Sequence, residues 1–242
     1  MLRAFFSIAL ACLGVPGAAE ELNIYLMEVP PLTMNAPDRK GVVGDTVLEA
    51  MRRAGYQPNL IIVPSNRALS VVGSPEVRDT LIIPLARLAE REQRFTWISP
   101  IVKVNRAFFT LDRTVNSFDD ARKGLASIGV SRGTAGVNLL LDAGIPSSQI
   151  YEINQGENGF RMLLARRIDA WFGPMAEGRT LRKLVDGEEK IAVGAPLAPT
   201  YNYLGCSKAC NNAIVGRLSD ALAAMEKDGT TRTIMRKYGA LD

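Results

Sequence analysis

Arginines follow a short apolar run in the first half of the chain. The run, Thr80–Ile83, is typical of a buried strand, and Pro84 should end it because proline donates no hydrogen bond to a sheet. The polar turn that comes next carries Arg87 and Arg91, with Arg94 close behind. A guanidinium beyond the carboxyl end of a strand can donate two parallel hydrogen bonds to a carboxylate. The turn is therefore a candidate anion site, and the alternative is that its charges are simply solvated.

The N-terminus has the pattern of a secretory signal peptide. Arg3 supplies the positive start, Ala4–Val15 is apolar but too short to cross a bilayer as a helix, and Gly17-Ala18-Ala19 offers small residues for cleavage. We expect residues 1–19 to be removed after Ala19 and the mature protein to be soluble and periplasmic. No other apolar run is long enough to span a membrane, so we expect membrane contact only through a partner.

Two cysteines remain after this cleavage, Cys206 and Cys210. In an exported protein, a pair separated by three residues favours a disulfide over two free thiols, and a catalytic redox pair would more often be C-x-x-C. The chain contains no His, so we expect neither a metal site nor a cofactor.

Composition excludes one further class of partner. The 242 residues carry a net charge of +4, which becomes +3 once Arg3 is removed, and no basic run is interleaved with aromatic residues. This mild, scattered charge argues against nucleic acid. The length suits one large domain or two lobes of about 100 residues each.

Two β-α-β-α-β series make up most of the chain, which predicts an α/β fold with mostly parallel sheets covered by helices. The first series has strands at 22–27, 59–63 and 80–83 and helices at 44–54 and 66–72, the first helix opening with Thr46 and Glu49 at the spacing of a capping box. The second has strands at 127–130, 149–153 and 169–172 and helices at 135–143 and 157–167. Further strands are expected at 107–111, 190–193 and 201–204, and further helices at 117–122, 177–185 and 212–227.

Seven short motifs occur in order along the mature chain. They are Pro30-Pro31-Leu32, Gly44-Asp45 with its helix, Ala86-Arg87-Leu88-Ala89-Glu90-Arg91, Phe95-Thr96-Trp97-Ile98-Ser99-Pro100, Ile128–Thr134, Leu163–Ala170 and Met225–Tyr238. Together they resemble the periplasmic solute-binding proteins of family 3, the type II fold that serves polar amino acid ABC transporters. The resemblance implies two lobes with a ligand cleft between them.

The same resemblance implies lobe boundaries and a function. Lobe one would span 20–104 plus 200–242, and lobe two 105–199, with two crossing segments as the hinge. A small carboxylate-bearing solute, an amino acid or an organic acid, would close the cleft, and an ABC permease or a membrane sensor would recognise the closed form. We expect a monomer without enzymatic activity.

Site residues carry over from the family one at a time. Arg91 matches the arginine that grips a ligand carboxylate, and Thr134 matches a hydroxyl residue at a helix N-terminus, where free amides and the helix dipole favour an anion. Thr134 could also be a plain N-cap. Arg132, Arg87 and Arg67 lie in turns that should face the cleft, although each alone could equally be solvated.

Departures from the family pattern leave the cation half of an amino acid site in doubt. Val29 replaces the usual aromatic residue, Ala86 replaces a small hydroxyl residue, and the acid that receives the ligand's ammonium falls at about Pro174. Glu28 and Glu157 are candidate substitutes, and without one the arginines favour an acidic or ammonium-free ligand. Two alternatives stay open, an enzyme resembling the cyclohexadienyl dehydratases and a degenerate member that acts as a protein-interaction module.

Overall fold

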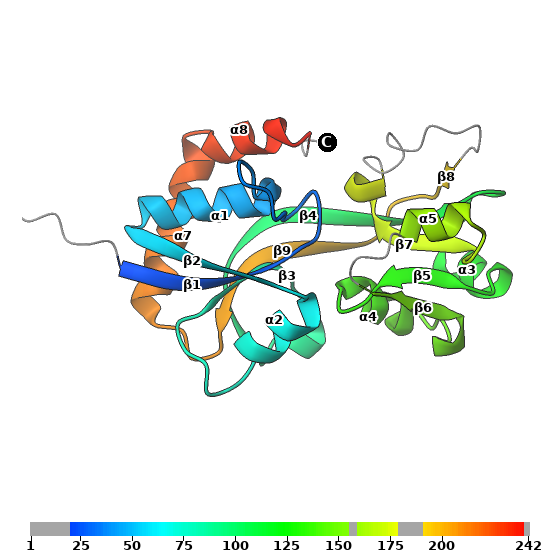
Figure 1. Ribbon diagram of the computed structural model, residues 1–242, viewed down its shortest axis with the longest axis horizontal. Coiled ribbons are helices and arrows are strands. Elements are labelled where there is room, and N and C mark those ends of the chain that lie inside the picture. The colour runs from blue at the N-terminus through cyan, green and yellow to red at the C-terminus, as the bar shows by residue number, and fades with distance from the viewer. Residues whose placement is uncertain (1–19, 155–158, 179–190, 240–242) are drawn as a thin grey trace, which may run out of the picture.

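The computed structural model describes residues 20–154, 159–178 and 191–239, so the expected signal peptide lies outside the described residues. Two lobes lie side by side, with strands running from one into the other (Figure 1). The predicted α/β class is confirmed, because helices flank a central sheet in both lobes.

The first lobe contains the N-terminal elements and the two C-terminal helices. It comprises β1 (Glu20–Met27), α1 (Gly41–Arg53), β2 (Tyr56–Val63), α2 (Ser65–Val72), β3 (Leu81–Ala86), the 3₁₀ helix η1 (Ala89–Arg91), α7 (Asn212–Lys227) and α8 (Thr230–Lys237). Strand β1 pairs in parallel with both β2 and β3.

The second lobe is built from the middle of the chain. It comprises α3 (Phe118–Gly124), β5 (Ile128–Ser131), α4 (Ala135–Asp142), the 3₁₀ helix η2 (Ser147–Gln149), β6 (Ile150–Ile153), α5 (Gly159–Leu164), β7 (Ala170–Pro174) and β8 (Ala192–Val193). Strand β5 pairs in parallel with β6 and β7. Of the expected helix at 177–185, only its first two residues are described, within a helical stretch at 175–178.

Two long antiparallel strands join the lobes, β4 (Phe95–Thr110) and β9 (Leu197–Ser207). The strand order is β2-β1-β3-β9-β4-β7-β5-β6, with β8 pairing to β4, so a single sheet runs through the molecule. The outer pairs are parallel as predicted, whereas every pairing made by β4 and β9 is antiparallel. The strand expected at 107–111 is therefore only the far half of β4.

The predicted end of the strand at Pro84 is wrong. Pro84 does not end β3, which continues to Ala86, because a register shift between Ile82 and Leu85 leaves the proline out of the pairing with β9. Likewise, Pro100 lies inside β4 next to two further register shifts. Irregular pairing of this kind accommodates a residue that has no N–H to donate.

Helix α1 begins earlier than predicted, at Gly41, so the expected capping box at Thr46 and Glu49 is wrong. The Thr46 hydroxyl instead donates to the Val42 carbonyl, one turn back within the helix. Gly41 has a φ of +85°, and a Cβ there would lie 2.5 Å from the Leu32 carbonyl oxygen. The packing of the preceding loop therefore sets where the helix starts.

Helix α5 ends before the expected 167. Arg166 stands where the family pattern has glycine and adopts a φ of +53°, in the left-handed region that glycine prefers. Its guanidinium pairs with both carboxylate oxygens of Asp112, with the shorter contact at 2.9 Å.

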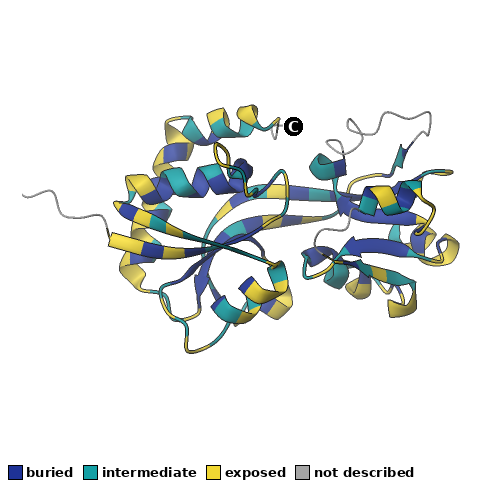
Figure 2. Cartoon of the chain, in the orientation of Figure 1, coloured by how far each residue is buried: buried dark blue, intermediate teal, exposed yellow. Residues whose placement is uncertain are grey.

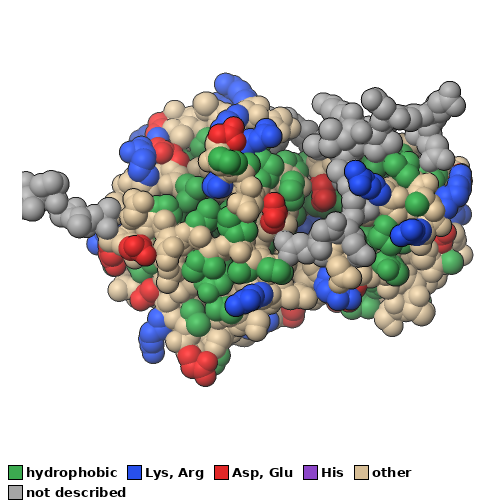
Figure 3. Space-filling view, viewed as in Figure 1, with side chains coloured by type: hydrophobic (Ala, Val, Ile, Leu, Met, Phe, Trp, Pro, Cys, Tyr) green, Lys and Arg blue, Asp and Glu red, His purple; other side chains and the backbone are tan. Residues whose placement is uncertain are grey.

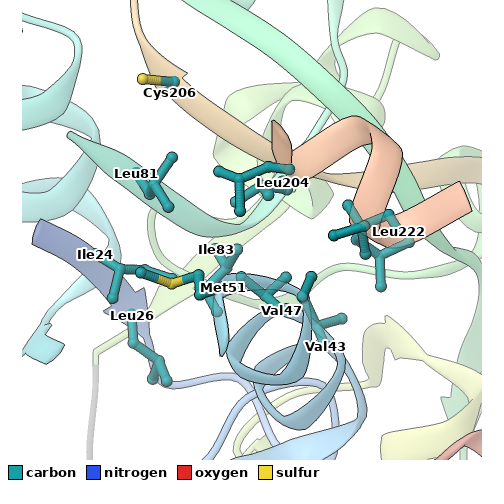
Figure 4. Close-up of a cluster of buried hydrophobic side chains, with 14 of the residues drawn as sticks. Ile24, Leu26, Val43, Val47, Met51, Leu81, Ile83, Leu204, Cys206 and Leu222 are labelled. Atoms are coloured by element: carbon teal, nitrogen blue, oxygen red, sulfur yellow. The ribbon is translucent and has the colours of Figure 1, made fainter. Parts of the chain in front are cut away.

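Buried residues concentrate in the sheet and on the inner faces of the helices (Figure 2). In the first lobe, α1 and α7 pack against β1, β3 and β9, and Figure 4 shows Met51, Ile83, Leu204 and Leu222 within this core. Helix α7 has the predicted bounds, and its apolar stripe is buried as expected at Ile214, Leu218, Leu222 and Met225. Separate clusters fill the second lobe around Phe108 and Phe109.

The predicted disulfide joins Cys206 at the end of β9 to Cys210 in the loop before α7. None of the described helices combines the length and the apolar character that crossing a membrane requires.

Candidate functional site

A cavity of about 560 Å³ lies between the two lobes. Its volume is in the range of pockets that hold small ligands. Both lobes contribute polar side chains to its lining, namely Glu28, Ser65, Asn66, Arg91, Arg106, Ser131, Arg132, Thr134, Asn154, Glu177 and Asn202. On the face seen in Figure 3, charges of both signs are scattered over the lobes, and acidic side chains also lie at their junction.

Arg91 reaches the cavity from η1 and is only 7% exposed. Its Nη1 donates to the Ala86 carbonyl at 3.3 Å, and its Nε lies 3.6 Å from Glu90 Oε1, which is too long for a strong hydrogen bond. Burial lowers the pKa of Arg91, and the nearby Glu90 carboxylate partly opposes this shift. The guanidinium is therefore desolvated and retains donors for an anion in the cavity.

Thr134 faces the same cavity from the other lobe, as the N-cap of α4. Its hydroxyl oxygen accepts from the Gly136 amide at 3.3 Å and donates to the Ser131 carbonyl at 2.7 Å. A Cβ on Gly136 would lie 2.6 Å from Val130 Cγ2, so the glycine lets the start of the helix pack closely on β5. This arrangement presents the positive end of a helix dipole to the cavity.

Two more predicted site residues line the cavity but are exposed. Arg132 donates through Nε to Glu152 at 3.2 Å, so its charge is already paired. Glu28 accepts from the Asn35 amide at 3.4 Å. Both residues remain accessible to water at the edge of the cavity. Glu157, the other candidate acid, lies outside the described residues.

Arg87 and Arg67 do not line the cavity, contrary to our expectation. Side chains alternate along an extended chain, so while Ala86 lines the cavity, Arg87 points elsewhere. Arg87 forms a double ion pair with Glu92, at 2.7 and 3.0 Å, and stacks 5.3 Å from the ring centres of Trp97 and Tyr203. Arg67 lies on the exposed face of α2.

The sequence reasoning missed Arg106, a second buried arginine in the cavity lining. It belongs to β4, is 5% exposed, and donates through Nη1 to Thr200 Oγ1 at 2.8 Å. Burial lowers its pKa to about 10, helped by the charge of Arg91 and opposed by Glu177. Side-chain alternation gave no signal for this arginine, because a register shift between Val104 and Arg106 interrupts β4 and residues 106–110 are all buried.

The sequence reasoning also missed Glu177, a half-buried acid three residues after Pro174. Burial raises its pKa to about 8, and Arg106 partly opposes the shift. The carboxyl group is therefore mostly protonated at neutral pH. An acid does stand near the position that the family pattern gives to an ammonium receptor, but burial favours its neutral form.

Glu177 should make the stability of the protein depend on pH. Its carboxyl group keeps a proton up to about pH 8 when folded but releases it near its ordinary pKa of 4.5 when unfolded. Between these values the folded state binds more protons, so this group's contribution to the unfolding free energy falls as pH rises. Glu177→Gln cannot ionise, and we expect urea denaturation to show it gaining stability over the native protein between about pH 5 and about pH 8. If the difference in unfolding free energy between Glu177→Gln and the native protein were the same at both pH values, this assignment would be contradicted.

Solved structures with the same two-lobe fold cover nearly the whole chain. EhuB in complex with hydroxyectoine has a TM-score of 0.78 at 22% identity, covering 90% of this chain and 88% of that one. The arginine-, lysine- and histidine-binding protein ArtJ from Geobacillus stearothermophilus has a TM-score of 0.78 at 17% identity, covering 92% and 96%. A histidine kinase sensor domain with similarity to periplasmic binding proteins has a TM-score of 0.77 at 16% identity, covering 91% and 96%.

At these identities the likeness establishes the fold, and it confirms the predicted two-lobe architecture of the periplasmic solute-binding proteins. Neither a protein-family model nor a curated protein sequence matches the chain.

Proposed function

We propose that this is an exported solute-binding protein that captures a small carboxylate-bearing solute in the cleft between its lobes. The observation that carries the proposal is that two groups suited to bind an anion, one from each lobe, line the same cavity. Arg91 supplies a buried guanidinium whose nearest carboxylate, that of Glu90, lies 3.6 Å away, and the N-terminus of α4 supplies a capped helix end opposite it. A carboxylate held between them would draw the lobes together.

The comparisons support binding as the function and leave two routes for its use. Similar structures include a complex with hydroxyectoine and a binding protein for arginine, lysine and histidine, and another is a sensor domain of a histidine kinase. We propose that the closed form of the protein is recognised by an ABC permease or by a membrane sensor.

The lobe boundaries of this proposal follow the long strands. Lobe one comprises 20–104 and 200–242, lobe two comprises 105–199, and β4 and β9 form the hinge where they cross. The proposal includes export to the periplasm with cleavage after Ala19, and a monomeric mature protein.

An enzyme on the same scaffold has one feature in its favour. Residues 129–133 read Gly-Val-Ser-Arg-Gly, which matches the G-x-S-x-G pattern, and Ser131 lines the cavity between β5 and α4. In hydrolases with this pattern, a histidine activates the serine. The chain has no histidine, so we propose binding without bond chemistry.

A thermal-shift screen of amino acids and organic acids tests the proposed function. A ligand at 100 times its dissociation constant adds about 2.7 kcal/mol, which raises the melting temperature of a protein of this size by about 5–10 °C. We expect shifts with carboxylates and none with matched neutral amides or amines. The proposal fails if no carboxylate shifts the melting temperature. Product formed from prephenate would favour the dehydratase alternative, and capture of a periplasmic protein without any shift would favour the interaction module.

A further inference from the structure

Arg106 carries a buried positive charge that has no role in the proposed function as described above. It sits in β4, where that strand passes between the lobes, and its guanidinium donates to the neutral hydroxyl of Thr200. Among the described residues, no carboxylate oxygen lies within the 4.0 Å that defines an ion pair with Arg106. A guanidinium this deeply buried is costly without a counter-charge, and the side that borders the cavity is where one can enter.

The acids of the cavity do not provide that counter-charge. Glu28 is exposed, and its carboxylate accepts from the Asn35 amide. Glu177 interacts with Arg106 electrostatically, but burial keeps its pKa near 8 and so keeps its proton in place at neutral pH. A neutral carboxyl group can donate a hydrogen bond to an anion but cannot balance a positive charge.

Arg91 is also only weakly compensated. Glu90, the carboxylate nearest to it, lies 3.6 Å away and also accepts a 2.6 Å hydrogen bond from Asn138 of the opposite lobe. The positive charge of Arg91 lowers the pKa of Arg106, so these two buried guanidiniums lie close enough to repel each other. Two buried guanidiniums without a short ion pair therefore line the cavity.

A buried amide adds a further hydrogen-bond donor to the cavity lining. Asn202 lies on β9 two residues after Thr200, is 3% exposed, and lines the cavity. Its side chain makes no hydrogen bond to any other residue that the structure describes, so its amide is available to a ligand. A guanidinium, an amide and a protonated carboxyl group are all donors that an anion can accept from.

We propose that the natural ligand is a dicarboxylate, with one carboxylate held by Arg91 and the α4 N-terminus and the second held by Arg106. This inference rests on the proposed function, because it names the class of solute that the same cleft takes. The ligand's two charges would compensate the two buried guanidiniums.

Matched ligand pairs test the proposal, since each pair differs only in whether the second carboxylate is replaced by an amide. The pairs are succinate with succinamate, glutarate with glutaramate, and L-glutamate with L-glutamine. By titration calorimetry at neutral pH, we expect at least one of these dicarboxylates to bind the native protein at least about tenfold more tightly than its monoamide.

Variants of Arg106 then test whether this residue is the source of the preference for the dicarboxylate over its monoamide. Arg106→Gln should weaken binding of that dicarboxylate at least about tenfold while changing the affinity for its monoamide less than about threefold. Arg106→Lys keeps the charge and should retain part of the preference for the dicarboxylate. If the Gln variant does not fold, the Lys variant still tests the assignment. Arg52→Gln removes an exposed arginine on α1 and should leave both affinities unchanged.

Three results would overturn the inference. Equal affinity for both members of every pair in the native protein would do so and would leave the proposed function intact. A preference that survives in Arg106→Gln would show that Arg106 does not hold the second carboxylate. Absence of binding by any carboxylate, including the monoamides, would overturn both this inference and the proposed function.

Discussion

Replacing Arg91 by alanine should reduce the affinity for the carboxylate ligand at least about 100-fold, which corresponds to about 2.7 kcal/mol. The buried guanidinium is the charged donor that the first lobe offers from η1, and removing one partner of a desolvated charge pair typically costs 2–5 kcal/mol. Titration calorimetry with the acid that gives the largest thermal shift measures the loss directly.

Arg87→Ala is the matched control for this variant. Arg87 is four residues away and carries the same group, but it pairs with Glu92 and stacks on Trp97 and Tyr203 outside the cavity. We expect its removal to leave ligand affinity within about threefold of the native value, well under the 1.4 kcal/mol that a tenfold change requires. If Arg87→Ala lost affinity and Arg91→Ala did not, the two assignments would be reversed.

Replacing Gly133 by valine should weaken ligand binding by about five- to 150-fold, equivalent to about 1–3 kcal/mol of overpacking. Gly133 belongs to the second lobe and has a φ of +72°, and a Cβ there would lie 2.2 Å from Oδ1 of Asn66 in the first lobe. With the lobes as they lie in the structure, a side chain at this position would meet Asn66 and would have to displace it. Opening of the cleft relieves the clash, so the penalty falls mainly on the ligand-bound form.

A double variant separates this clash from backbone strain. Gly133→Val combined with Asn66→Gly removes the nearest opposing side chain and should recover much of the affinity, whereas strain from the positive φ would persist in both variants. Calorimetric titration of the single and double variants gives the coupling between the two sites. Independent effects of the two substitutions on affinity would show that the residues do not meet across the cleft.

Motifs and local patterns predicted features that lie at the ends of helices. The family motif placed Thr134 at a helix N-terminus, with a plain N-cap as the alternative, and the structure shows it capping α4. The bounds of α7 were also predicted correctly, since its apolar stripe runs through four full turns between Asn211, which caps it, and Asp228.

Other parts of the site depend on tertiary structure that local patterns do not encode. Arg87 and Arg91 look alike in sequence, but strand β3 continues past Pro84 and thereby decides which of them faces the cavity. Arg106 was overlooked because the strand was expected to begin at 107, one residue after it, whereas β4 begins at Phe95 and carries the arginine into the cavity lining. Glu177 becomes part of the site only because the second lobe brings it near Arg106.

A crystal structure of the mature protein with the acid that gives the largest thermal shift tests the central claim most directly. We expect the ligand between the lobes, with carboxylate oxygens within about 3.2 Å of the Arg91 guanidinium and of an amide in the first turn of α4. A ligand bound outside this cavity, or an Arg91 side chain turned toward solvent while the ligand is bound, would contradict the account.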